Sequence, residues 1–231
     1  MARPAKLPEK LAGTPHRVVW PAGTTLYRVH RKTRSGADFN ATVVDHHFGG
    51  TRFDSTRNDK YAYLYLAPSA ETAIIESLLK ELPVDDGEPR VVSYSAIEDR
   101  RLSRLELLTD VTLLSLLDRR AMSAVNQGTW LIQSESPDYP FTRRWGHWLR
   151  GQADWAQGLV WTSKQNHPEP TAVLFGDRFG RLLGKDGTGK DVNEVLRPVP
   201  GGAIDLDDSP GRRWLDSTLD AYCARVGAPP D

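Results

Sequence analysis

Residues 49–79, GGTRFDSTRNDKYAYLYLAPSAETAIIESLL, contain the side-chain types in this chain that are best suited to chemistry. The segment places an arginine beside an aromatic residue, then three alternating tyrosines, and then a glutamate on a predicted helix. A guanidinium group can bind phosphate through two parallel hydrogen bonds, and an aromatic ring can stack on a planar group. A carboxylate can stabilise a developing positive charge. The segment is therefore the first candidate for a functional site.

Spacing alone leaves a purely structural explanation open. Tyrosine has a high strand propensity, so the three tyrosines could belong to an ordinary half-exposed strand. Glu76 and Lys80 are four residues apart on the polar side of the predicted helix. They could form a solvent-exposed ion pair that contributes only a few tenths of a kcal/mol. The residue types by themselves do not decide between this explanation and a functional site.

The elements that would position these residues are a strand over residues 59–67 and a helix over residues 70–82. Alternation predicts one strand face with Tyr61, Tyr63 and Tyr65, and an opposite face with Ala62, Leu64 and Leu66. Ser69 is the expected N-cap of the helix. The patterns also predict further strands over residues 24–30, 42–48, 90–96, 158–163 and 171–179. Further helices are predicted over residues 111–122, 141–156 and 212–226.

The composition bounds the class of protein. A chain of 231 residues fits one large domain, and mixed strands and helices without a strict βαβ rhythm predict an α+β fold. The 30 basic and 30 acidic residues balance, which argues against direct binding of nucleic acid or of a membrane surface. The single cysteine, the lack of a long apolar run and the lack of a signal sequence predict a cytoplasmic protein.

Several familiar motifs are incomplete. GKDGTGKD, residues 184–191, fits a phosphate-binding loop until Asp191, which stands where serine or threonine would hold magnesium. No Gly-x-Gly-x-x-Gly follows a strand, so a Rossmann cofactor site is not expected. Adjacent strand residues such as His46 and His47 point to opposite faces, so no metal site is predicted there.

The wider pattern resembles the RES domain, a family named for its Arg, Glu and Ser. The matching blocks are LYRVHR (26–31), GGTRFDSTRND (49–59), YLAPSAETAIIESLL (65–79) and GLVWTSKQN (158–166). Their order and character are similar to the family's across most of residues 22–180. The family commonly has Gly-Arg-Trp or a close relative where this chain has Thr51-Arg52-Phe53.

This resemblance implies an ADP-ribosyltransferase-like mixed β core with surrounding helices in a single domain. It implies an NAD⁺-binding catalytic domain at residues 21–200. The Pro-, Lys- and Ala-rich composition predicts a loosely attached arm at residues 1–20, and the pattern predicts a C-terminal extension at residues 201–231 with a helix packed on the domain. RES domains are toxins of bacterial toxin–antitoxin pairs that consume NAD⁺. The implied partner is an Xre-like antitoxin with a helix-turn-helix domain. NAD⁺ would be a substrate, with inorganic phosphate as a further co-substrate, and no resident cofactor or metal is expected.

Position by position, the resemblance nominates Arg28, Tyr65, Glu76 and Ser163 as catalytic residues. It adds Arg52 and Phe53, with Arg28 and Tyr65, as residues that bind NAD⁺. Cleavage of the nicotinamide–ribose bond develops an oxocarbenium-like ribose, which the Glu76 carboxylate would stabilise. The Tyr65 ring would stack on nicotinamide, and the two arginines would bind phosphates or the adjoining ribose. Ser163 would contact the substrate or orient Glu76.

Three functions remain open at this stage. The first is an enzyme that degrades NAD⁺, by hydrolysis or by phosphorolysis to ADP-ribose phosphate. The second is a transferase that moves ADP-ribose onto a cellular protein, since the nominated residues activate only the donor. The third is a catalytically silent module whose Trp-rich helix, around residues 142–156, binds another protein. Exposure of Trp145, Trp148 and Trp155 as a patch would favour the third function.

Overall fold

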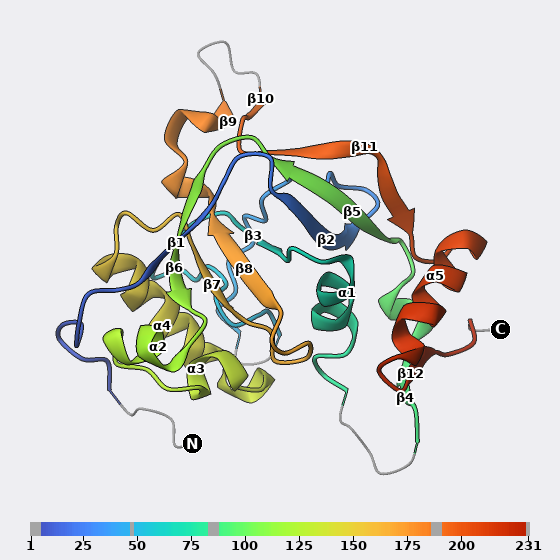
Figure 1. Ribbon diagram of the computed structural model, residues 1–231, viewed down its shortest axis with the longest axis horizontal. Coiled ribbons are helices and arrows are strands. Elements are labelled where there is room, and N and C mark those ends of the chain that lie inside the picture. The colour runs from blue at the N-terminus through green and yellow to red at the C-terminus, as the bar shows by residue number, and fades with distance from the viewer. Residues whose placement is uncertain (1–5, 47–48, 83–87, 186–190, 230–231) are drawn as a thin grey trace.

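The computed structural model describes residues 6–46, 49–82, 88–185 and 191–229 of the chain. That part contains two main sheets, two short strand pairs and five α-helices, mixed irregularly along the sequence (Figure 1). The arrangement is α+β, as the sequence predicts. Three hydrophobic cores join these elements, and each core belongs to a different layer.

The larger sheet carries the first core. Its spatial strand order is β1 (Arg17–Trp20), β6 (Val111–Leu116), β7 (Gly158–Thr162), β8 (Pro170–Phe175) and β3 (Tyr63–Leu66). Only β6 and β7 run parallel among these neighbours. The helices over one face are α2 (Arg119–Ala124), α3 (Trp130–Gln133) and α4 (Tyr139–Gln152), which gather at one end of the molecule (Figure 1). Trp161 of the sheet and Trp145 of α4 meet in this core.

The smaller sheet covers the opposite face of the larger one. Its antiparallel strands are β11 (Leu196–Asp205), β5 (Arg100–Leu107) and β2 (Thr25–Arg31). Leu26 and Leu105 of this sheet pack with Leu64 and Leu174 of the larger sheet to form the second core. The two sheets join where Tyr27 and Ala67 exchange backbone hydrogen bonds of 2.7 and 3.0 Å.

A third core lies under the smaller sheet. Its elements are α1 (Ala70–Leu78), α5 (Ser209–Asp220), β4 (Arg90–Val92) and β12 (Ala224–Val226). The remaining elements are the pair β9 (Leu183–Lys185) and β10 (Asp191–Asn193), and short 3₁₀ turns at Tyr94–Ala96, Ser136–Asp138, Gly176–Arg178 and Gly180–Leu182. Figure 1 shows α1 between the helices over the larger sheet and α5 at the opposite end.

The predicted alternation along residues 59–67 is confirmed, although only its second half is a regular strand. Tyr61 and Tyr63 are buried in the first core. Leu64 and Leu66 point into the second. The strand therefore separates an aromatic layer from an aliphatic one, which is what its period-two pattern predicts.

The helix that follows this strand also begins where the sequence predicts. Ser69 is the N-cap, and its hydroxyl accepts a 3.0 Å hydrogen bond from the backbone N–H of Thr72. The helix ends at Leu78, four residues before the predicted end. Ile74 and Ile75 are fully buried under the smaller sheet, so the helix is fixed through its apolar face.

The strand predicted over residues 42–48 is wrong for its described part, residues 42–46, which have no regular secondary structure. A buried arginine replaces the missing partner strand. The Arg143 guanidinium donates to the carbonyl oxygens of Val44 and His46, both at 3.0 Å. Because these carbonyl groups are satisfied by a side chain, the segment does not need a sheet neighbour.

The helix predicted over residues 111–122 is wrong in its first half, which is strand β6. Leu113 faces the second core and Leu114 the first, so both faces of the strand are apolar and the period-two signal is hidden. Asp118 then caps α2 by accepting a 2.8 Å hydrogen bond from the backbone N–H of Ala121.

Two strands are not predicted, and two predicted elements have other bounds. Strands β5 and β11 are not predicted, because β5 is rich in arginine and β11 contains proline and glycine around an irregularity between Pro198 and Ala203. The predicted strand 90–96 ends at Val92, and the predicted helix 212–226 is α5 followed by β12. The GKDGTGKD motif falls mostly on residues 186–190, which lie outside the described residues.

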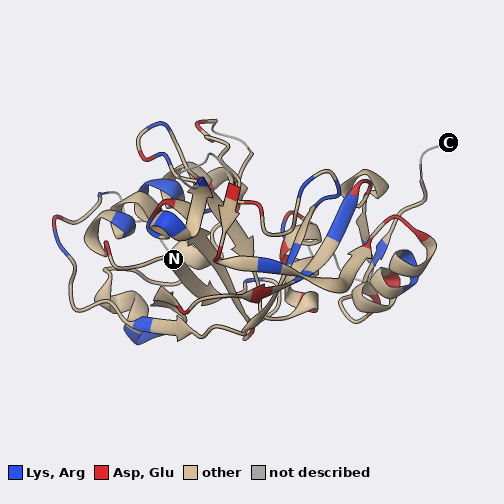
Figure 2. Cartoon of the chain, turned by 90° about the horizontal axis from the view of Figure 1, so that it is seen from above, with Lys and Arg blue, Asp and Glu red and all other residues tan. Residues whose placement is uncertain are grey.

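The charged residues of the described part of the chain are mixed in sign. Figure 2 shows basic and acidic residues interspersed along the whole molecule, in keeping with the formal net charge of zero. None of the helices in the described ranges has the length and apolarity that a bilayer crossing requires.

Candidate active site

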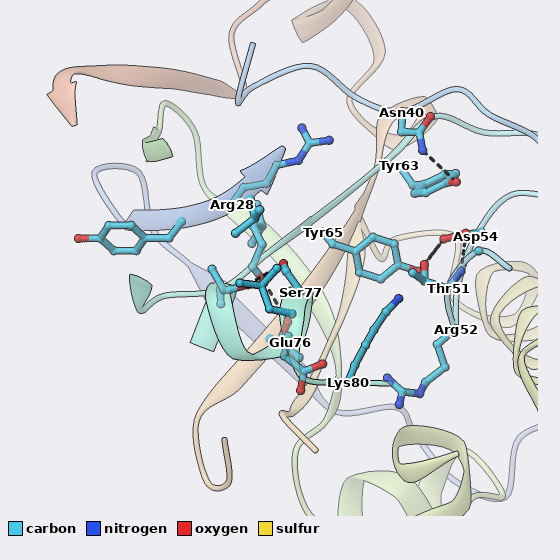
Figure 3. Close-up of a pocket in the computed structure, with 18 of the residues that line it drawn as sticks. Arg28, Asn40, Thr51, Arg52, Asp54, Tyr63, Tyr65, Glu76, Ser77 and Lys80 are labelled. Carbon is cyan, nitrogen blue, oxygen red and sulfur yellow. Dashed lines mark hydrogen bonds between the residues drawn. The ribbon is translucent and has the colours of Figure 1, made fainter. Parts of the chain in front are cut away.

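A cavity of about 690 Å³ opens at the junction of the two sheets. It is lined by β2, by residues 40–44 and 50–54, by β3 and by α1. Figure 3 shows Arg28 on one side of Glu76, Arg52 and Lys80 on the other, and the Tyr65 ring between them. The fold thus brings four of the six nominated residues, Arg28, Arg52, Tyr65 and Glu76, to one cavity.

Glu76 reaches the cavity from α1 and is held from behind. Its Oε1 accepts hydrogen bonds from the Ser163 hydroxyl and, at 3.3 Å, from the backbone N–H of Gln165. Lys80 pairs with Glu81 at 3.9 Å and not with Glu76. The solvent-exposed Glu76–Lys80 pair considered for this spacing is therefore not formed, and the carboxylate is instead fixed by two neutral donors.

Ser163 supports the site without lining it. It follows the last residue of β7, and only 1% of its surface is exposed. Its hydroxyl accepts a 2.9 Å hydrogen bond from the backbone N–H of Asn166 and donates its own proton to Glu76. Of the two roles expected for Ser163, this geometry favours the orientation of Glu76.

The Tyr65 hydroxyl is fully engaged by the neighbouring loop. It accepts a 2.8 Å hydrogen bond from the backbone N–H of Phe53 and donates one of 3.0 Å to Asp54 Oδ1. Burial, together with the nearby Asp54 carboxylate, raises the pKa of Tyr65 well above its ordinary value. The phenol is therefore neutral at physiological pH, and the ring is the part of this side chain that can contact a ligand in the cavity.

The two nominated arginines hold different protein groups. Arg28 Nη1 donates to the carbonyl oxygens of Gly36 at 2.9 Å and Asp38 at 2.5 Å. Burial lowers the pKa of Arg28 to about 10, so the group remains a cation at neutral pH. Arg52 donates from Nη2 to the carbonyl oxygen of Ser134 at 3.0 Å and lies 5.4 Å from the centre of the Tyr139 ring.

Neither arginine is neutralised by a carboxylate. In the part of the chain that the structure describes, Arg28 and Arg52 have no ion pair within 4.0 Å. Their hydrogen bonds go to backbone oxygens and a serine hydroxyl, which fix the guanidinium planes without cancelling the charge. Two preorganised cations at a cavity wall suit an anionic ligand.

Phe53 is placed differently from the other nominated residues. Its ring is fully buried and packs edge-to-face on Trp161, with ring centres 5.1 Å apart. It does not line the cavity, but its backbone N–H binds the Tyr65 hydroxyl. A direct contact between Phe53 and NAD⁺ stays a prediction, and the buried ring points to a supporting role.

The loop that carries Arg52 depends on residues that the sequence did not single out. Asp54 accepts from the backbone N–H of Thr51 at 2.6 Å and from the Thr51 hydroxyl. Arg143 donates to Thr51 O at 3.2 Å and Gly49 O at 2.6 Å. Gly50 has φ +71°, and a Cβ added there would lie 2.8 Å from Asp54 Oδ2. Only glycine fits at position 50, between the side chains of Asp54 and Arg143.

Lys80 is a further cavity residue that sequence reasoning missed as a site residue. Its side chain is 27% exposed and extends toward Arg52 and Tyr65 (Figure 3). Burial lowers its pKa from the ordinary value of 10.5, while Glu81 and Asp54 act in the opposite direction. The available signal was its position one turn after Glu76. The same spacing is equally typical of an ion pair on the helix surface.

The Trp-rich helix does not form an exposed patch. Trp145 is 3% exposed, and Trp148 and Trp155 are partly buried against the same core. Arg17 lies over the Trp155 ring at 4.0 Å from its centre. The main reason to consider a silent interaction module is thereby removed.

Comparison with known proteins adds to this geometry. The sequence matches the family model described as the RES domain over residues 25–187, which is more than half of the chain. No curated protein matches the chain. The fold is similar to that of a chain in the crystal structure of the M. tuberculosis MbcT–MbcA toxin–antitoxin complex, with a TM-score of 0.51 and 17% identity over 81% of this chain and 86% of that chain.

Proposed function

The chain belongs to the RES domain family, and from that membership we propose that it is a bacterial toxin that depletes NAD⁺ by cleaving its nicotinamide–ribose bond. The observation that carries the proposal is a single cavity in which an oriented carboxylate, an aromatic ring and three cations converge. These groups match the parts of NAD⁺, which has a planar nicotinamide ring that departs as a neutral molecule, a ribose and a pyrophosphate.

Glu76 is proposed to stabilise the transition state. When the bond between ribose C1′ and the nicotinamide nitrogen breaks, both electrons stay with nicotinamide, and positive charge develops on the ribose. Ser163 and Gln165 both bind Oε1, which leaves Oε2 as the oxygen to face the sugar. A carboxylate that is already oriented requires little reorganisation when the charge appears.

The aromatic and cationic walls are proposed to bind the two ends of the substrate. The Tyr65 ring stacks on nicotinamide, because its hydroxyl is occupied by Asp54 and its ring faces the cavity. Arg28, Arg52 and Lys80 bind the pyrophosphate or the adjoining ribose. Lys80 adds to the two arginines a second type of cationic donor, an ammonium group on a flexible side chain.

An acceptor then completes the reaction at C1′. With water, the products are nicotinamide, ADP-ribose and a proton. With inorganic phosphate, the products are nicotinamide and an ADP-ribose phosphate, and the phosphate oxygen forms the new bond to C1′. Transfer to a protein side chain would use the same donor-activating residues, so the assay below treats it as a separate outcome.

The proposed partner is a cognate antitoxin. The similar fold from M. tuberculosis was solved in a toxin–antitoxin complex, and the cavity of this chain is open at the sheet junction. We propose an antitoxin of the Xre-like, helix-turn-helix type that blocks this cavity. Co-purification of the chain with the product of a neighbouring gene, followed by loss of NAD⁺ cleavage on complex formation, tests this part.

Product analysis tests the activity itself. Purified protein is incubated with NAD⁺, with and without inorganic phosphate, and the nicotinamide and ADP-ribosyl products are separated and identified. Release of nicotinamide only with phosphate identifies a phosphorylase, and release without it identifies a hydrolase. If no nicotinamide is released in either condition, direct NAD⁺ depletion is wrong. Labelling of cellular protein by NAD⁺ would then identify a transferase.

A further inference from the structure

A continuous path of hydrogen bonds leads from the C-terminal segment to the Glu76 carboxylate. The Tyr222 hydroxyl donates to Asn166 Oδ1 at 2.7 Å, and Asn166 Nδ2 donates to Thr72 Oγ1 at 2.9 Å. The backbone N–H of Asn166 donates to Ser163 Oγ at 2.9 Å, and Ser163 donates to Glu76. The path therefore connects the turn between α5 and β12 with the carboxylate proposed to act on ribose.

The direction of the Ser163 proton in this path is defined by its neighbours. Ser163 has one hydroxyl proton, and because its oxygen accepts from the Asn166 N–H, the proton is free to point at Glu76. The Asn166 amide is held at both ends, its oxygen by Tyr222 and its nitrogen by Thr72. Thr72 and Glu76 lie four residues apart on one face of α1, so this amide anchors the 163–166 turn beside Glu76.

Tyr222 is itself held in place. Its backbone carbonyl accepts from Arg90 Nη2 at 3.0 Å, and the backbone N–H of Arg90 donates to Cys223 O at 2.9 Å. Its hydroxyl proton has two acceptors within reach, the nearer Asn166 Oδ1 at 2.7 Å and Glu71 Oε1 at 2.9 Å, and the two share it. Burial and that carboxylate raise the pKa of Tyr222 to about 12, so the phenol remains a donor at neutral pH. The segment around Tyr222 is thus fixed by hydrogen bonds to the neighbouring strand and helix.

None of the residues that act through this path lines the cavity. Tyr222, Asn166 and Ser163 are absent from the cavity walls, so they cannot act by touching a ligand there. Tyr222 also lies beyond residues 25–187, the part that matches the RES family model. Any effect of Tyr222 on chemistry must therefore pass through the 163–166 turn or through Glu71 on α1.

We propose that Tyr222 is a positioning residue for this site, which orients Asn166 so that Ser163 holds Glu76 in its productive conformation. The inference rests on the proposed NAD⁺ cleavage and deepens it, because the C-terminal segment becomes part of the machinery that supports the carboxylate. The site is complete only when the chain beyond the family-matched residues is folded against α1.

A double-mutant cycle tests the proposal in the full-length protein. Tyr222→Phe removes the donor and keeps the ring, and we expect kcat for nicotinamide release to fall roughly three- to ten-fold, the effect of one lost hydrogen bond. KM should stay within two-fold, because the cavity walls are untouched. In a Ser163→Ala background the same substitution should change kcat by a smaller factor than in wild type, because only the longer Gln165 N–H bond still connects the turn with Glu76.

Tyr94→Phe is the matched control. Tyr94 packs against the same core as Tyr222, and its hydroxyl has no hydrogen-bond partner in the described ranges of the chain. This variant should keep both kcat and KM. Thermal unfolding of each variant confirms that it is folded. A Tyr222→Phe variant with kcat within two-fold of wild type would overturn the proposal. The proposal would also be overturned if Tyr222→Phe lowered kcat by the same factor in the Ser163→Ala background as in wild type.

Hydrogen exchange separates this inference from the proposed function. Exchange of the Gln165 and Asn166 backbone amides should be faster in Tyr222→Phe than in wild type and unchanged in Tyr94→Phe. If the wild-type protein releases no nicotinamide, the proposed function fails, and this measurement alone decides whether Tyr222 holds the turn. Unchanged exchange of both amides in Tyr222→Phe would then reject the positioning role.

Discussion

The two walls of the cavity are held by different physical means. The carboxylate wall consists of Glu76, fixed by a serine hydroxyl and a backbone N–H. The loop wall consists of residues 49–54, whose backbone carbonyls at Gly49 and Thr51 are bound by the guanidinium group of Arg143. One wall therefore depends on neutral donors acting on a charge, and the other on a buried charge acting on neutral acceptors.

This difference predicts that substitutions in the two walls affect different properties of the protein. A typical neutral hydrogen bond contributes about 0.5–1.5 kcal/mol to folding, so substitutions behind the carboxylate should leave the protein folded. Arg143 is 1% exposed and binds four backbone carbonyls, which would lose their donor together if it were replaced. Changes to the carboxylate wall should therefore alter rates, whereas changes under the loop wall should alter the free energy of unfolding.

Arg143→Met tests the loop wall most strongly. We expect the free energy of unfolding to fall by about 3 kcal/mol or more, because buried carbonyl groups are left without a donor. Arg144→Met is the matched control, since Arg144 is the next residue on α4 and is exposed. Denaturant unfolding of both variants measures the difference. A loss of less than about 1 kcal/mol for Arg143→Met would mean that the loop holds its shape without the guanidinium.

Tyr65→Phe tests the connection between the walls. The substitution removes the hydroxyl that joins β3 to Asp54 and to the backbone N–H of Phe53, so the free energy of unfolding should fall by about 1–2 kcal/mol. The ring remains, so NAD⁺ cleavage should persist, whereas Tyr65→Ala should remove it. Denaturant unfolding and nicotinamide release are measured on both variants. Loss of cleavage in a folded Tyr65→Phe protein would show that the hydroxyl, not the ring, is essential.

Lys80→Gln tests whether this cation belongs to the binding wall. KM for NAD⁺ should rise roughly three- to ten-fold with little change in kcat, as expected for the loss of one partly buried charge contact to phosphate. Lys80→Arg keeps the charge and should stay near wild type at pH 7. A KM within two-fold of wild type in Lys80→Gln would remove Lys80 from the binding wall.

The pH dependence of KM sharpens the same comparison. Burial lowers the pKa of Lys80 below its ordinary value of 10.5, so its charge is lost earlier as pH rises. Wild-type KM should therefore begin to rise below pH 10.5. Lys80→Arg should show a smaller rise in that window, because only Arg28, whose pKa is about 10, still loses its charge there. Steady-state kinetics of the two proteins between pH 7 and 10.5 measure this difference.

The same two walls explain what the sequence could predict. Tyr65 and Glu76 lie in one continuous strand-to-helix stretch, where alternation and the Ser69 cap are local signals. The supports of the loop wall come from far along the chain, since Arg143 lies 92 residues from Thr51. Tyr222 and Asn166 are likewise 56 residues apart. No local pattern identifies such partners, because their significance arises only when the fold brings them together.

The most direct test of the account is the rate of nicotinamide release by Glu76→Gln. Glutamine keeps the size and accepts the Ser163 hydrogen bond, but it lacks the negative charge proposed to stabilise the ribose. We expect kcat to fall by about 10²–10³-fold with wild-type unfolding, while Glu98→Gln, at an exposed glutamate outside the cavity, should retain full activity. Unchanged release of nicotinamide by a folded Glu76→Gln protein would contradict the central claim.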